Sequence, residues 1–334
     1  MKFRILSASA LVCALAAAAW AQDDKSKQAE VKISGGERDA AQKIEKAKGV
    51  EARLQAAAAF VKKYPQSALR RQVAEVMVNE IAASTDAQAR VSLAEVFRDI
   101  FNLPEEGALI NHTLLNAYIG AGKTEEALKL GNDWLAAHPD DVQTMQNLTI
   151  LASTAAIKGD NSYVAQGRQH GAKAIELIEA DKMPAGFDAA KWPQYKPAAL
   201  ATLYRETGVL AYKAGDKRAA QPLLEKAASL KSTDPGVYLI LSELNNDVYE
   251  LRAKEYQIAS DAEKPAALKQ VEAALDKVIE SYAQAIGATE GDARYQQVNV
   301  ALRQDIERYY KFRNKNSTEG LQQLIDKYKR PAAQ

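Results

Sequence analysis

The sequence predicts an all-α protein, a solenoid of about six antiparallel helix pairs, and three observations support this prediction. The 334 residues include 17 glycines and 10 prolines, fewer of these helix breakers than average usage would give. Alanine, the strongest helix former, occurs in runs such as residues 56–59. Apolar residues recur at spacings of three and four along most of the chain, which is the pattern of amphipathic helices.

The N-terminus carries the pattern of a secretory signal peptide. Two basic residues, Lys2 and Arg4, precede an uncharged, mostly apolar run over residues 5–19, and an Ala-Trp-Ala cleavage pattern ends it. The run is shorter than the roughly 20 residues that span a bilayer as a helix. We therefore expect residues 1–21 to be cleaved after Ala21, and the mature chain to be periplasmic or secreted, without membrane association.

The only cysteine, Cys13, lies inside this leader. Lipidated leaders carry a small residue directly before the cysteine and usually leucine three residues before it, whereas Val12 and Ala10 occupy those positions here. We therefore expect no lipidation. The mature chain then contains no cysteine, which excludes cysteine nucleophiles and thiolate metal sites.

The segment after the leader has the composition of a flexible tether. Residues 22–36 are polar and charged and lack an apolar stripe, which predicts a flexible tether before a helical-repeat domain over residues 37–330. Loss of Lys2 and Arg4 with the leader changes the formal net charge from +1 to −1. A nearly neutral chain argues against a nucleic-acid partner.

Helix pairs follow one another along the domain. The run from Val237 to Leu241 alone could be a strand, but Asp234 and Pro235 supply an N-cap and a first-position proline for a helix. The apolar pattern predicts pairs over residues 37–64, 67–101, 104–138, 140–180, 194–231 and 235–287, with a final pair over 292–330.

Capping residues mark several of the predicted helix starts. Thr85 with Gln88 is predicted to form a capping box, and Asp140 and Asp261 are predicted N-caps. Prolines are expected where helices begin or end, at Pro65, Pro104 and Pro139.

Two segments share a spacing that amphipathic periodicity does not require. Each has a glycine at the end of its first helix, Gly122 or Gly215, and an alanine early in the next helix, Ala127 or Ala220. Glycine readily adopts the left-handed conformation that ends a helix, and a small residue lets two helices cross closely. We therefore expect two similar helical hairpins.

These segments, residues 114–139 and 207–235, resemble tetratricopeptide repeats, and weaker matches extend over most of the chain from residue 50. Leu115 and Trp134 depart from the family by standing where it prefers small residues. The resemblance implies a right-handed superhelical solenoid whose first helices line a concave groove that binds a peptide or a protein surface, without catalysis. The residues that the resemblance places in this groove are His112, Asn116, Gln146, Thr149, Ser153, Thr202, Arg205, Tyr212, Glu243 and Asn246.

The sequence offers no convergent catalytic or cofactor site. Gly122-Lys123-Thr124 resembles the end of a phosphate-binding loop, but Ala117 stands where the earlier glycine is required. The three histidines lack zinc-site spacing, and no G-x-S-x-G elbow is present. We therefore expect no enzyme activity, no cofactor and no metal.

Two other segments have alternative interpretations. Residues 181–197 are the longest expected irregular stretch after the tether, and Phe187 and Trp192 within it either cover the core or form an exposed docking knob. The segment from Arg303 to the C-terminus contains eight basic and four acidic residues. They either complement helix dipoles or contact an anionic lipid or glycan surface.

Together these observations predict a non-catalytic protein–protein interaction scaffold of the bacterial cell envelope, which binds an unidentified protein or peptide segment in the groove. The alternative is an envelope protein that binds or processes a glycan or peptide and uses the solenoid as its substrate platform. A third hypothesis is a structural solenoid that associates with itself.

Overall fold

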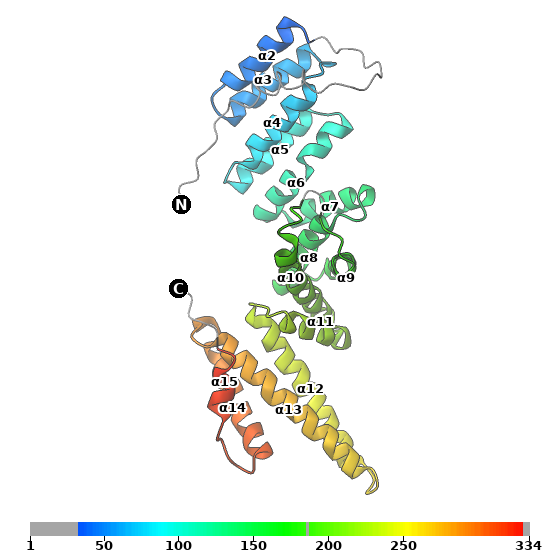
Figure 1. The fold of residues 1–334 in the computed structure, drawn as a ribbon, viewed down its shortest axis with the longest axis vertical. Coiled ribbons are helices and arrows are strands. Elements are labelled where there is room, and N and C mark those ends of the chain that lie inside the picture. The colour runs from blue at the N-terminus through cyan, green and yellow to red at the C-terminus, as the bar shows by residue number, and fades with distance from the viewer. Residues whose placement is uncertain (1–32, 185–186, 330–334) are drawn as a thin grey trace. The chain divides into compact units, whose positions relative to one another are not determined.

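The computed structural model describes residues 33–184 and 187–329. Over these ranges the protein is all-α, with fourteen α-helices, one short 3-10 helix and no strand (Figure 1). The predicted leader, with Cys13 and the cleavage position, and most of the predicted tether lie outside the described residues. Among the helices described, none is both long and apolar enough to cross a bilayer.

The chain divides into two compact units, residues 1–134 and 135–334, and the division falls inside α7. Helix α2 begins at Gly35, two residues before the predicted domain boundary. The helices of the first unit are α2 (Gly35–Lys46), α3 (Val50–Lys63), α4 (Arg70–Ala82), α5 (Ala87–Ile100), α6 (Pro104–Gly120) and α7 (Thr124–Ala137). The second unit contains α8 (Val142–Ile157), α9 (Val164–Glu179), α10 (Trp192–Lys213), α11 (Lys217–Ser229), α12 (Pro235–Ile258), α13 (Lys264–Thr289), the 3-10 helix η1 (Ala293–Tyr295), α14 (Gln296–Arg313) and α15 (Leu321–Asp326).

Contacts between helices confirm five of the predicted pairs. Consecutive helices pack together in α2/α3, α4/α5, α8/α9, α10/α11 and α12/α13, and α14 and α15 both pack on α13. The prediction of an all-α stack of helix pairs is therefore confirmed.

The two glycine turns have the predicted geometry. Gly122 and Gly215 have φ angles of 72° and 77°, which lie in the left-handed region. The residue after each glycine donates its backbone N–H to a carbonyl five residues earlier, in the pattern of a Schellman motif. Ala127 and Ala220 have no exposed surface, as expected for small side chains early in the second helix of each segment.

A buried ion pair joins α4 to α6 within the first unit. Arg70 and Glu106 are 7% and 3% exposed, and Arg70 Nη2 donates to Glu106 Oε2 at 2.9 Å. Arg70 also donates to the carbonyl oxygen of Pro65 at 3.3 Å. These contacts satisfy charges that would be costly to bury alone.

In the second unit, α9 packs closely between α8 and α10 because it carries two glycines on one face. A Cβ atom at Gly167 would lie 2.4 Å from the Cβ of Ala152 in α8 and 2.9 Å from Leu210 in α10. A Cβ atom at Gly171 would lie 2.1 Å from Thr207 Oγ1. Side chains at these positions would force the three helices apart.

The predicted capping residues of α5 and α8 are each displaced by one residue. The N-cap of α5 is Asp86, whose Oδ1 accepts from the backbone N–H groups of Gln88 and Ala89 at 2.8 and 3.0 Å, so the Thr85 capping box is wrong. The N-cap of α8 is Asp141 and not Asp140. Asp140 accepts instead from Lys182. In both places the carboxylate adjacent to the first helical residue takes the cap.

The prediction for the start of α13 is also wrong. Its N-cap is Glu263, and the carboxylate of Glu263 accepts from Ser260 N at 3.0 Å. Asp261 accepts from Lys264 Nζ at 3.1 Å. Pro265 lies in the first turn, where its missing N–H has no intrahelical partner to lose, and it fixes the helix start there.

The stretch predicted as irregular over residues 181–197 is shorter, because α10 begins at Trp192. Trp192 is 8% exposed, and its Nε1 donates to Asp181 Oδ1 at 2.9 Å. Its ring lies 6.0 Å from that of Phe187. The burial of Trp192 supports the interpretation in which these aromatic residues cover the core.

Candidate functional site

The candidate site is the face formed by the first helices of successive pairs in the second unit. Three tyrosine hydroxyls link these helices, and the acceptor in each case is a residue that the sequence placed in the groove. The three hydrogen bonds run from Tyr195 Oη to Gln146 Oε1 (3.0 Å), from Tyr212 Oη to Glu243 Oε2 (2.6 Å) and from Tyr309 Oη to Asn246 Oδ1 (2.9 Å). Helices α8, α10, α12 and α14 are thereby joined in order.

The contact between Tyr212 and Glu243 belongs to a larger polar cluster. Lys217 Nζ contacts Glu243 Oε1 at 3.3 Å and Asp247 Oδ2 at 2.6 Å. Burial, followed by the hydrogen bond to Glu243, raises the pKa of Tyr212 to about 12. The phenol therefore stays protonated at neutral pH and keeps donating to the carboxylate. Glu243 itself is exposed, so a ligand on this face can reach it.

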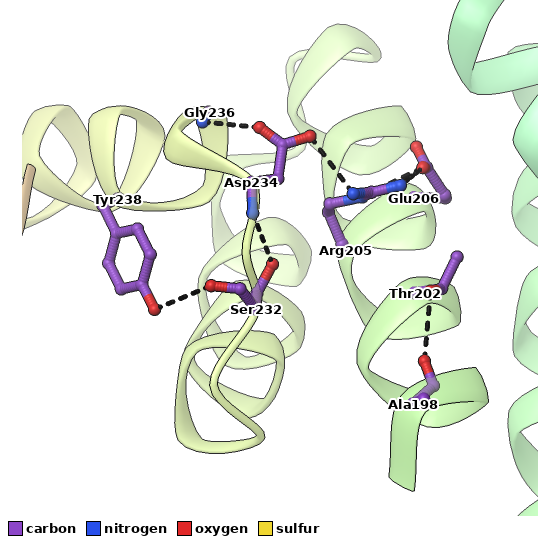
Figure 2. Close-up of polar contacts among 8 residues, drawn as sticks. All are labelled: Ala198, Thr202, Arg205, Glu206, Ser232, Asp234, Gly236 and Tyr238. Atoms are coloured by element: carbon purple, nitrogen blue, oxygen red, sulfur yellow. Dashed lines mark hydrogen bonds and ion pairs between the residues drawn. The ribbon is translucent and has the colours of Figure 1, made fainter. Parts of the chain in front are cut away.

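The side chain of Arg205 extends from α10 toward Asp234 at the start of α12 (Figure 2). Its Nη1 atom is 3.2 Å from Asp234 Oδ2, and its guanidinium also donates to the carboxylate of Glu206. Asp234 is the N-cap of α12, with Oδ1 accepting from Gly236 N at 2.7 Å. Arg205 thus joins two successive helix pairs, and its charge is balanced by two carboxylates.

A pocket of about 220 Å³ lies beside Arg205, between α10 and the turn that precedes α12. Its polar lining includes Thr202 and Ser232. Thr202 Oγ1 donates to Ala198 O at 3.1 Å, and Ser232 Oγ accepts from Asp234 N at 3.3 Å (Figure 2). Lys231 is the second cation of the lining. The pocket therefore presents hydroxyl groups and two cations, and the two carboxylates beside it pair with Arg205.

Two predicted groove residues, Thr149 and Ser153, do not belong to this face. Both have no exposed surface. Thr149 Oγ1 donates to Met145 O at 2.8 Å, and Ser153 Oγ has no hydrogen-bond partner within the described part of the chain. Helix α8 contacts both α9 and α10, so its buried face is wider than that of a helix with one neighbour. The two residues are consequently removed from the candidate site.

His112 and Asn116 lie in the other unit, on α6, and both are exposed. The His112 ring lies 5.1 Å from the ring of Trp134, in an edge-to-face arrangement.

One exposed surface contains none of the predicted groove residues. It lies on α14 and the turn after it, where Arg308, Lys311, Phe312 and Lys315 surround a hollow of about 820 Å³. Phe312 is 75% exposed. The excess of basic residues in the C-terminal segment was the available sequence signal. Lys311 and Arg313 do lie in the last turn of α14, as dipole complementation requires, but this role does not explain an exposed phenylalanine among them.

No group of three or more His, Cys, Asp or Glu residues in the described ranges could hold a metal ion. Glu243 and Arg205 of the candidate face are engaged in contacts between helices.

No family model matches the chain, and no curated protein matches it. Among solved structures, a tetratricopeptide repeat protein from Parabacteroides merdae is similar, with a TM-score of 0.37 and 11% sequence identity, over 80% of this chain and 96% of that chain. The helix pairing described above comes from the contacts of this chain and is independent of that similarity.

Proposed function

We propose that this protein is a non-catalytic scaffold that binds a segment of another protein along the first helices of its second unit. The observation that carries this proposal is the row of tyrosine hydrogen bonds that joins α8, α10, α12 and α14. A face held in place before binding loses little conformational entropy when a ligand arrives, which favours recognition of a surface.

The composition of the face supports the same function. It combines half-buried aromatic side chains such as Tyr212 with exposed carboxylates such as Glu243 and a guanidinium at Arg205. Tyrosine and arginine are enriched among the residues that dominate binding energy in protein interfaces. The proposed location in a bacterial cell envelope rests on the predicted signal peptide.

The proposal can be tested by site-specific photo-crosslinking in the full chain, expressed with its own leader. A photoreactive phenylalanine analogue is placed at Thr202 of α10 or Glu243 of α12, and matched controls carry it at Glu225 of α11 or Lys277 of α13. Glu225 and Lys277 are exposed and lie on second helices. Cross-linked products are then identified by mass spectrometry.

We expect the analogue at Thr202 and at Glu243 to crosslink to the same protein. The analogue at Glu225 or at Lys277 should give no adduct with that protein. Adducts of equal yield from all four positions would overturn the assignment of the face. Adducts with glycan alone would contradict the protein-binding function and favour the alternative of a glycan-binding platform.

A further inference from the structure

The hollow on α14 combines an exposed apolar side chain with an excess of positive charge. Phe312 is 75% exposed, although a phenylalanine side chain gains free energy from burial. Its neighbours in the lining include Arg308, Lys311 and Lys315, whereas Glu307 is the only acidic residue there. An aromatic residue set among cations is a common composition of binding surfaces.

The positive charges on this surface are only partly compensated. Arg308 Nη2 contacts Asp305 Oδ1 at 3.0 Å, and Lys311 Nζ contacts Glu307 Oε1 at 2.6 Å. Such exposed pairs contribute little free energy, so the carboxylates of a ligand can replace them. Lys315 has no ion-pair partner among the residues that the structure describes.

The turn after α14 keeps Lys315 beside Phe312. Lys315 and Asn316 have φ angles of 51° and 68°, in the left-handed region. Asn316 N donates to Lys311 O at 2.7 Å, which folds the turn back against the end of the helix. The position of the uncompensated cation is therefore set by the backbone as well as by its flexible side chain.

We propose that this hollow binds an acidic segment of a protein partner that carries a large apolar side chain. The apolar side chain packs on Phe312, and the carboxylates of the segment pair with Lys315, Arg308 and Lys311. This inference rests on the proposed scaffold function and specifies the chemistry of one partner.

The test is a fluorescence anisotropy titration of the full mature chain with labelled synthetic peptides. The first peptide contains glutamate and leucine, the second replaces each glutamate by lysine, and the third replaces each leucine by serine. We expect the glutamate and leucine peptide to bind more tightly than either control, and its affinity to fall as salt is raised, because salt screens exposed charges.

Variants locate the binding on the hollow. Phe312→Ser should weaken binding of the first peptide by about tenfold, as expected for the loss of an aromatic contact in an interface. Lys315→Glu should weaken it by about fivefold at low salt and reduce the salt dependence. The matched controls are Val298→Ser, on the same helix and 42% exposed, and Lys254→Glu, an exposed lysine on α12. Both should leave the affinity unchanged.

Three results would overturn the proposal. They are equal affinity for the acidic and basic peptides, binding that Phe312→Ser leaves intact, and binding to phosphatidylglycerol vesicles that depends on Phe312 while the peptides do not bind. The crosslinking experiment above places no photoreactive residue on α14. If it captures no protein, the proposed scaffold function is contradicted independently of this hollow. If crosslinking captures a protein partner but Phe312→Ser leaves peptide binding unchanged, only the inference about the hollow is contradicted.

Discussion

Arg205 and Asp234 form an ion pair with 3.2 Å between Nη1 and Oδ2, where α10 meets the N-terminus of α12. The other oxygen of Asp234 accepts from Gly236 N, so one carboxylate both caps a helix and joins two successive helix pairs. The substitution Arg205→Glu would set two carboxylates against each other. It would therefore perturb the joint between the pairs as well as any ligand contact.

The same contact predicts the effect of removing the cap. Asp234→Ala should lower the free energy of unfolding by about 1–2 kcal/mol, because a lost N-cap alone costs about that much. Urea unfolding followed by far-ultraviolet circular dichroism measures the change. Asp247→Ala is the matched control, since Asp247 is exposed and pairs with Lys217 at the surface, and its cost should not exceed about 0.5 kcal/mol. Equal costs would contradict the capping role.

A second prediction concerns the glycines of α9. Gly171→Ala should destabilise the protein by about 1–3 kcal/mol, because the new Cβ would overlap Thr207 and press on Thr149. Gly107→Ala in α6 should have the opposite sign and stabilise by roughly 0.5–1 kcal/mol, since nothing lies within 4 Å of the new Cβ and alanine favours the helix. Urea midpoints of the two variants check both signs. A stable Gly171→Ala variant would mean that α9 packs less closely than described.

Lys231 supplies a third prediction. It follows the C-terminus of α11 with a φ angle of 58°, in the kind of position that Gly122 and Gly215 occupy after other helices. Lys231→Gly should raise the free energy of unfolding by about 1 kcal/mol, because glycine adopts this conformation without steric cost. Gly215→Ala should lower it by a similar amount. If thermal unfolding shows no gain for Lys231→Gly, the left-handed conformation at this residue is wrong.

A fourth prediction concerns alkaline pH. Burial, followed by the hydrogen bond to Glu179, raises the pKa of Tyr204 from 10.0 to about 12. Above pH 10 the unfolded chain releases this proton while the folded chain retains it, so the contribution of Tyr204 to stability falls as pH rises from about 10 to about 12. The free energy of unfolding of Tyr204→Phe should therefore fall less between pH 9 and pH 11 than that of the unsubstituted protein. Urea titrations at the two pH values measure both changes. Parallel curves for the two proteins would contradict the shift.

Helix pairs could be predicted because both of their determinants are local in sequence. The apolar spacing of three and four fixes which face of each helix is buried, and Gly122 and Gly215 fix where the first helix of a pair ends. Cap residues were less certain because Thr85 and Asp86, or Asp140 and Asp141, are adjacent and each can accept a backbone hydrogen bond. Only the exact backbone geometry decides between such neighbours.

Only part of the candidate site could be predicted, because the hydrogen bonds that hold it join residues far apart in the sequence. Gln146, Glu243 and Asn246 were placed in the groove by the resemblance, and each accepts a hydrogen bond from a tyrosine on a neighbouring first helix. Those donors lie 31 to 63 residues away in the sequence, so no local pattern shows the pairing. Thr149 and Ser153 were misplaced because the small residues of α9 bring it close enough to bury them.

The tyrosine hydrogen bonds also determine what binding to this face would cost. A ligand that takes Glu243 as its own partner competes directly with Tyr212 for that carboxylate. The contact between α10 and α12 would then rest on the ion pair between Arg205 and Asp234, which lies at the start of α12.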